Sequence, residues 1–270
     1  MLTATFRGKD GTMKKKIWVS SLTESKDSVK DLMARMKRYG LEVDGHFWED
    51  DLEKMAWMKP RDNIIDQSVV MWGILGSQEE FENPPIRYGL SALCATVQAK
   101  KGLGFPVALF VTLGEIDPST LPTPLRGAEI FPFGDASLGA KVVAKVYSAA
   151  PTVSAGYRFD VYGNAQIGQW FEIGPSSEQW EGAMFGVDEG EITFQAVGPK
   201  GRLPSTSVLN YPMKGLKLTL GEKNYTAWAV KNPIDSNTSY FVKVEGFPGT
   251  VIFSSFSESE ATDVFVYQLK

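Results

Sequence analysis

The sequence predicts an α/β domain in residues 1–150 followed by an all-β domain in residues 151–270. In the first half, segments with apolar residues at helical spacing alternate with short apolar runs. The run 69–75 has no polar alternation, which is typical of a parallel strand covered on both faces. In the second half, apolar and polar residues alternate with a period of two between Gly, Pro, Asn and Ser. We therefore expect a flavodoxin-like five-stranded parallel sheet with helices on both faces, then an antiparallel β-sandwich or jelly roll.

Residues 16–40 predict the first strand and the helix after it. Segment 16–20 is apolar enough for a strand. The next four residues, Ser21 to Glu24, fit a capping box, in which a hydroxyl and a carboxylate three residues later satisfy free backbone N–H groups. Gly40 is expected just past the C-terminus of the helix. The apolar positions at helical spacing are Val29, Leu32, Met33 and Met36.

The rest of the first half continues the alternation of strands and helices. We expect the segments centred on Met71 and Leu109 to be neighbouring strands inside the sheet. Pro84 and Pro85 favour the start of a helix, and Gly102 its end. In order, the predicted elements are strand 41–47, helix 58–67, strand 69–75, helix 84–102, strands 106–113 and 129–133, and helix 138–146.

The second half predicts nine strands at intervals of roughly ten residues. Short stretches rich in Gly and Pro separate them and are typical of hairpin connections. The expected strands are 157–162, 169–173, 183–187, 191–196, 215–220, 226–230, 240–245, 250–253 and 264–268.

Composition excludes several classes of function. The single cysteine, Cys94, excludes an internal disulfide, and the single histidine, His46, excludes histidine-rich zinc sites, so we expect no metal. A net charge of −4 argues against nucleic-acid binding, which usually needs a strongly basic surface. The apolar runs are too short to span a membrane, and the first 20 residues lack the apolar core of a signal peptide. We expect a cytoplasmic protein without membrane insertion, nucleic-acid binding or a cofactor of its own.

Three motifs in residues 16–147 resemble one known family. The first strand ends in Ser20 and Ser21 before a helix. Segment 47–52, Phe-Trp-Glu-Asp-Asp-Leu, is similar to the acidic and aromatic segment that leads into that family's second connecting loop. Trp57 and segment 62–68, Asp-Asn-Ile-Ile-Asp-Gln-Ser, come directly before the buried strand 69–75. This order is similar to the Trp, Ile, Ile and Ser pattern that precedes the third strand in that family. The family is the TIR (Toll/interleukin-1 receptor-like) domain, and the resemblance implies a role in signalling or, in its enzymatic members, cleavage of NAD.

The sequence departs from the enzymatic members at one position. Their catalytic glutamate lies in the helix after the third strand, and the matching place here falls near Arg87-Tyr88-Gly89, where there is no glutamate. The nearest acidic residues are Glu79, Glu80 and Glu82, in the expected loop before that helix. A carboxylate there could stabilise a developing oxocarbenium ion. The alternative is a solvated loop that precedes the helix at Pro84.

Two other groups are candidate ligand or partner sites. Ser20 and Ser21 end a strand where backbone N–H groups could meet a phosphate, or Ser21 could simply cap the helix. The loop that holds Asp50 and Asp51 is flanked by two tryptophans, which could stack on a base or nicotinamide, anchor a partner, or pack in the core. These tryptophans are Trp48 and Trp57. For His46, a strand-end imidazole beside a hydrated acidic loop is favoured over an acid–base site.

Three functions remain open from the sequence. The first is a signalling or protein-interaction protein that binds a protein partner or itself through loop 48–57, with a β domain that recognises a ligand. The second is an NAD-cleaving enzyme with a displaced glutamate, for which NAD would be the substrate. The third is carbohydrate binding by aromatic residues of the β domain, which could equally form its core. These are Trp170, Trp180, Tyr211, Trp228 and Tyr240.

Overall fold

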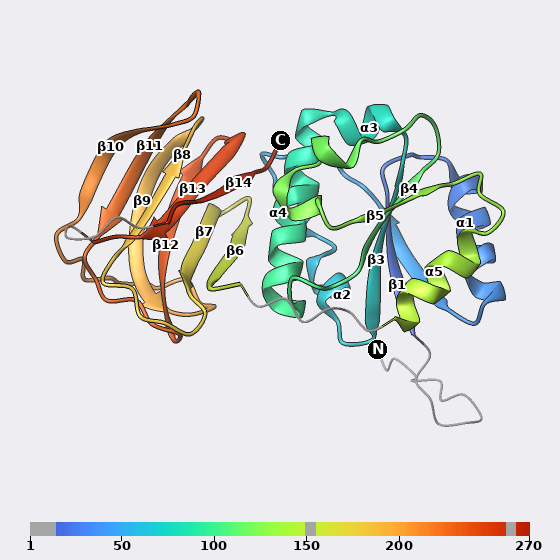
Figure 1. The fold of residues 1–270 in the computed structure, drawn as a ribbon, viewed down its shortest axis with the longest axis horizontal. Helices are drawn as coiled ribbons and strands as arrows, with labels where there is room; N and C mark the ends of the chain where they lie inside the picture. Colours follow the sequence, from blue (N-terminus) through green and yellow to red (C-terminus); the bar gives the residue numbers. More distant parts are fainter. Residues whose placement is uncertain (1–14, 149–154, 258–262) are drawn as a thin grey trace.

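The computed structural model describes residues 15–148, 155–257 and 263–270, and it confirms the predicted fold class. An α/β unit with a parallel sheet lies beside two antiparallel sheets, and a long helix stands between them (Figure 1). The domain boundary predicted near residue 150 lies outside the described residues.

The parallel sheet has the strand order β2-β1-β3-β4-β5. Strands β3 and β4 are parallel neighbours, with Ile74 opposite Leu109. Met71 and Leu109 are both fully buried, so the prediction that these two segments lie inside the sheet is confirmed. The strands are β1 (Lys16–Ser21), β2 (Glu42–Phe47), β3 (Val69–Gly76), β4 (Val107–Val111) and β5 (Glu129–Pro132).

Helices cover both faces of this sheet. One face packs against α1 and α5, where Leu32 and Val142 join the core, and the other packs against α4. The predicted helix 58–67 is shorter than expected, because a 3-10 turn ends before Pro60 and α2 begins after it. The helices are α1 (Lys26–Arg38), α2 (Arg61–Ile65), α3 (Gln78–Glu82), α4 (Pro84–Lys101) and α5 (Leu138–Tyr147), with 3-10 turns η1 (Ala56–Met58), η2 (Pro118–Thr120) and η3 (Thr123–Leu125).

The predicted capping box at Ser21 and Glu24 is wrong. Strand β1 runs on through Ser21, whose carbonyl accepts a hydrogen bond from the Trp48 N–H, 2.7 Å away. Helix α1 instead begins after Ser25, whose hydroxyl accepts from the Ser28 N–H. Continued pairing with the neighbouring strands therefore outweighs an early helix start.

The second half forms two antiparallel sheets that face each other. Their shared core is aromatic and includes Phe159, Phe171, Phe185 and Phe253. All nine predicted strands are present. One sheet has the order β6-β7-β12-β9 and the other β10-β11-β8-β13-β14. The strands are β6 (Tyr157–Asn164), β7 (Gly168–Pro175), β8 (Ala183–Val187), β9 (Glu191–Pro199), β10 (Met213–Leu220), β11 (Lys223–Val230), β12 (Thr238–Glu245), β13 (Thr250–Ser255) and β14 (Phe265–Gln268).

Helix α4 is buried on nearly all sides because it serves both halves. Every residue from Tyr88 to Val97 is buried, although a surface helix would expose one face. The Tyr88 hydroxyl donates to Gln169 Oε1 at 2.8 Å, and the Thr96 hydroxyl lies 3.1 Å from the Val161 carbonyl of edge strand β6. The helix thus covers a strand edge that would otherwise present unpaired backbone groups.

Candidate functional site

The carboxyl edge of the parallel sheet is where folds of this class bind ligands. Ser20 is fully buried at this edge, and its Oγ accepts a hydrogen bond from Trp72 Nε1 at 2.8 Å. Ser21 is 2% exposed and donates its hydroxyl to the Thr23 carbonyl at 2.7 Å. Both serines therefore hold the local fold, and neither presents a hydroxyl to a phosphate.

Leu22 lies next to the ends of β1 and β3, where the strand order reverses. Its N–H donates to the Leu75 carbonyl at 2.8 Å, which extends the pairing of β1 with β3 by one residue. Gly76 allows this approach, because a Cβ built there would lie 2.8 Å from Leu22 Cδ1. The open space lies at the next pair of strands in the sheet, β3 and β4.

That open space is a groove of about 540 Å³ at the ends of β3 and β4. The predicted loop with three glutamates is the short helix α3, and Glu80 closes a capping box there: its Oε2 accepts from the Ser77 N–H at 2.7 Å. Glu80 is therefore a helix cap. Glu79 and Glu82 do line the groove. The other lining residues are Ser77, Gln78, Asn83, Pro84, Leu113 and Gly114.

Gln78 fixes the shape of this groove. Its Oε1 accepts from the Glu115 N–H at 3.1 Å, and its Nε2 donates to Glu82 Oε1 at 2.8 Å. Gly114 has φ +81, and a Cβ there would collide with the Gln78 amide at 2.4 Å. Leu113 is left 76% exposed beside the carboxylates. The groove can thus accept hydrogen bonds from hydroxyl groups and offers one apolar contact.

Residues 87–89, which the sequence resemblance matched to a catalytic glutamate, lie on helix α4. Arg87 donates to the Thr120 carbonyl at 2.6 Å, and Tyr88 is fully buried against the β-sandwich. Gly89 packs against two tryptophans, since a Cβ there would lie 2.9 Å from Trp48 Cζ2 and 3.0 Å from Trp57 Cβ. All three residues are committed to packing between the elements.

The acidic loop, residues 47–54, presents less aromatic surface than the sequence predicts. Trp57, which follows it, is only 1% exposed, and Trp48 is partly buried against the core. Trp57 is therefore corrected from a surface anchor to a core residue, because Gly89 leaves room for its ring. Phe47, the last residue of β2, remains 42% exposed and is the most exposed aromatic ring at the start of this loop.

The acidic residues of this loop differ in their pairing. Asp51 accepts from both the backbone and the ammonium of Lys54, which lowers the pKa of Asp51. Glu49 pairs with Lys59. Partial burial, and then the neighbouring Asp51, raise the pKa of Asp50. Within residues 15–148, Asp50 forms no ion pair, so it remains available for a basic group.

His46 has a defined tautomer that the sequence did not reveal. Trp18 Nε1 can only donate, and it lies 3.1 Å from His46 Nδ1, so the neutral ring carries its proton on Nε2. Burial lowers the pKa of His46 to about 4, opposed by the charge of Glu49. His46 borders a small cavity of about 190 Å³ with Lys59 and Asn63. Its Nε2 has no partner in the described part of the chain.

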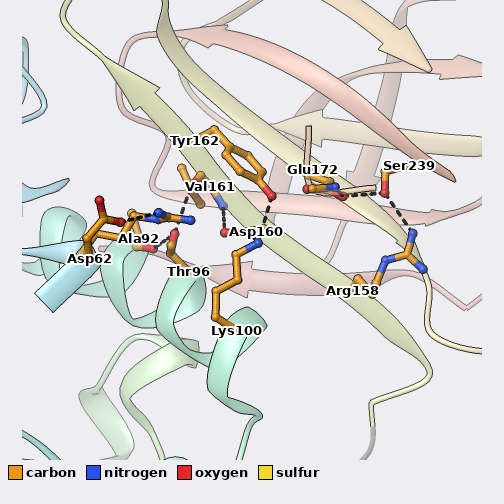
Figure 2. A network of polar contacts seen from close by, with 12 residues as sticks. Asp62, Ala92, Thr96, Lys100, Arg158, Asp160, Val161, Tyr162, Glu172 and Ser239 are labelled. Atoms are coloured by element: carbon orange, nitrogen blue, oxygen red, sulfur yellow. Dashed lines mark hydrogen bonds and ion pairs between the residues drawn. The ribbon is translucent and has the colours of Figure 1, made fainter. Parts of the chain in front are cut away.

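A buried charged network joins the two halves (Figure 2). Asp160 and Glu172 lie opposite each other on β6 and β7 and are 4% and 3% exposed. Lys100, from α4, places its ammonium 2.9 Å from Asp160 Oδ2 and 3.3 Å from the Tyr162 hydroxyl. Burial raises the pKa of Asp160, and Lys100 opposes this. Burial and both carboxylates raise the pKa of Tyr162.

The second carboxylate is held by neutral donors. Glu172 Oε1 accepts from the Ser239 hydroxyl at 2.6 Å and from the Gly201 N–H at 2.9 Å. Arg158 donates to the Ser239 hydroxyl at 2.9 Å (Figure 2). The alternation of charged Arg158 and Asp160 with apolar residues in β6 was the sequence signal for this network. Its partner in α4 lies about sixty residues away and could not be assigned from local pattern.

Within residues 15–148, 155–257 and 263–270, no group of three or more His, Cys, Asp or Glu side chains is arranged to hold a metal ion. No helix in that part of the chain is both long and apolar enough to span a membrane. No protein-family model matches this chain, and no curated protein matches its sequence.

Proposed function

We propose that this chain is a signalling or protein-interaction protein in which a TIR-like domain and a β-sandwich act as one unit. One observation carries the proposal: the helix that holds the catalytic glutamate in enzymatic members of that family is used here to dock the second domain. Arg87, Tyr88 and Gly89 are all occupied by packing or hydrogen bonds.

The acidic loop is the surface we assign to a partner. Phe47 offers an exposed ring, and Asp50 and Glu53 offer carboxylates without an ion-pair partner among the described residues. An aromatic side chain beside unpaired negative charge is suited to a basic surface. The partner is therefore a protein face rich in Lys or Arg, either of another protein or of a second copy of this chain.

Sedimentation equilibrium of the full chain tests the second copy directly. We expect reversible association that weakens as salt increases and that is lost in the double variant Asp50→Lys, Glu53→Lys. The control reverses two exposed acidic residues of the β-sandwich, Glu178→Lys and Glu222→Lys, and is expected to associate like the unchanged protein. A chain that stays monomeric at every concentration and also releases nicotinamide from NAD would overturn the proposal.

A second candidate is cleavage of NAD in the groove beside α3. The observation that favours it is that Glu79 and Glu82 line a groove at the carboxyl ends of β3 and β4. Purified protein would be incubated with NAD and nicotinamide measured by chromatography. Release that disappears in Glu79→Gln or Glu82→Gln, and persists in the distant variant Glu222→Gln, supports the enzyme. No release removes it.

A further inference from the structure

A row of side chains crosses the outer face of the sheet β6-β7-β12-β9. Tyr162 is opposite Trp170, Trp170 is opposite Lys243, and Lys243 is opposite Phe194. Residues opposite each other on neighbouring strands share a face, so these four side chains lie on the side away from the sandwich core. With strands about 4.8 Å apart, the row is about 14 Å long.

A β-bulge is what places Phe194 on this face. Ile192 is opposite Val244 and Phe194 is opposite Lys243, so three residues of β9 face two residues of β12. Without the extra residue, Ile192 and Phe194 would point to the same side. Instead Ile192 is 3% exposed in the core, and Phe194 is 54% exposed. A large apolar ring turned outward by a bulge has no packing role in the sandwich.

The neighbouring aromatic ring is held in position. Trp170 Nε1 donates to the Ile167 carbonyl at 3.1 Å. Its ring lies 5.8 Å from that of Phe194, at 66° between the planes. The two rings therefore form an angled apolar notch that is already ordered, which reduces the entropy lost when a ligand binds.

A donor and an acceptor lie beside the notch. The Lys243 stem passes Gly168, where a Cβ would lie 3.0 Å from Lys243 Cε, and its ammonium makes no hydrogen bond or ion pair with the residues described. Glu245, two residues along β12, is exposed on the same face. Glu191 is opposite Glu245 and is also exposed, so this surface carries one cation and two carboxylates and does not favour an acidic partner.

The other aromatic candidates of the β domain have different surroundings from Trp170, and Tyr211 among them is 75% exposed. Tyr240 is fully buried, Lys214 lies 4.4 Å above the Trp228 ring, and Lys231 lies 5.0 Å from the Tyr211 ring. The Trp180 side chain is partly buried and packs against the core. Trp170 is thus the tryptophan of this domain that faces outward beside a second exposed ring.

We infer that the notch formed by Trp170 and Phe194, with Lys243 and Glu245 beside it, is a binding site for a neutral oligosaccharide. The apolar C–H face of a pyranose ring packs on aromatic rings, and its hydroxyls pair with a donor and an acceptor at the edge. Tyr162, at one end of the row, already contacts Lys100, so the accessible part runs from Trp170 to Phe194. It spans two strand spacings, about 10 Å, which fits about two sugar units in a chain. The inference does not depend on the proposed interaction through the acidic loop.

Calorimetric titration of the full chain with maltohexaose and cellohexaose tests the site. We expect one of these two neutral probes to bind with a Kd below about 1 mM, and Trp170→Ala and Phe194→Ala each to weaken binding by about tenfold. Trp228→Ala, on the other sheet, is the matched control and is expected to leave binding unchanged. Thermal unfolding of each variant shows that it remains folded.

Three outcomes would overturn the inference. The first is absence of binding for both neutral hexasaccharides. The second is an equal loss of binding in Trp228→Ala, which would place the sugar elsewhere. The third is tighter binding of oligogalacturonate or polyglutamate than of either neutral probe, since that would assign the face to an acidic partner.

Discussion

The surroundings of helix α4 and the outer face of the sheet β6-β7-β12-β9 use the same kinds of side chain in opposite ways. Near α4, Trp57 is buried and Lys100 is paired with a buried carboxylate. On the outer sheet face, Trp170 is partly exposed, and Lys243 has no ionic partner in the described chain. What covers a side chain, and not its type, separates a structural role from a binding role.

The difference arises from the shape of α4. Small residues such as Gly89 and Ala92 let other elements approach the helix closely, so rings and charges from both halves become enclosed. Nothing described in the structure covers Phe194 in the same way, since it is 54% exposed. If the comparison is right, matched substitutions in the two regions should have very different effects on stability.

The largest contrast is expected between the two tryptophans. Trp57→Ala removes a fully packed ring and should reduce the free energy of unfolding by about 4 kcal/mol. Trp170→Ala should cost less than about 1 kcal/mol, because its ring is partly in water. Urea unfolding of both variants measures the difference. Equal losses would show that the two rings are covered to a similar extent.

The next effect concerns His46 and pH. Burial lowers the pKa of His46 from its usual value of 6.5 to about 4, so the unfolded chain binds a proton between these values that the folded chain does not. Stability is therefore complete above about pH 6.5 and falls as the pH drops towards about 4, by about 3 kcal/mol from this residue. His46→Asn keeps an acceptor for Trp18 and should flatten the dependence. Urea unfolding of both proteins across this pH range measures the effect. If the free energy of unfolding depends on pH in the same way in both, the loss of stability does not come from His46.

The order of strands and helices could largely be predicted from the sequence, but their caps and contacts could not. The pattern Ser-x-x-Glu occurs at Ser21 and again at Ser77, and only the second is a capping box. The first fails because the Ser21 peptide still pairs with neighbouring strands. Strand pairing is a property of distant residues, so the local pattern alone is ambiguous.

The candidate site was predicted less well for the same reason. Burial of Trp57 depends on Gly89, and exposure of Phe194 depends on a bulge opposite Lys243. Neither relation has a local signature. One signal was available: helix 84–101 has few charged residues on any side, which is typical of a helix enclosed by two layers. It predicts that α4 lies between two bodies, though not which residues meet.

The same comparison can be made with two lysines, one from each region. Lys100→Met leaves Asp160 buried without its cation and should cost about 2 kcal/mol, less than a fully enclosed pair would because the ammonium is partly hydrated. Lys243→Met should change stability by less than about 0.5 kcal/mol. Burial raises the pKa of Asp160, so the cost of Lys100→Met should shrink as the pH falls and the carboxyl takes up a proton. Adding Asp160→Asn to Lys100→Met should restore part of the lost stability. If the double variant is no more stable than Lys100→Met alone, Lys100 acts through something other than this carboxylate.

The smallest effect is expected for two glycines. Ala is the better helix former by about 1 kcal/mol, yet Gly89→Ala would push a methyl group to 2.9 Å from Trp48 and 3.0 Å from Trp57. Overpacking of this kind outweighs the helical gain, so we expect a net loss of about 1 kcal/mol. Gly127→Ala meets no atom within 4 Å and should be neutral or slightly stabilising. Thermal unfolding distinguishes the two, and a stabilising Gly89→Ala would mean that the tryptophans can move away from α4. In that case Trp48 and Trp57 would again be available as anchors for a partner.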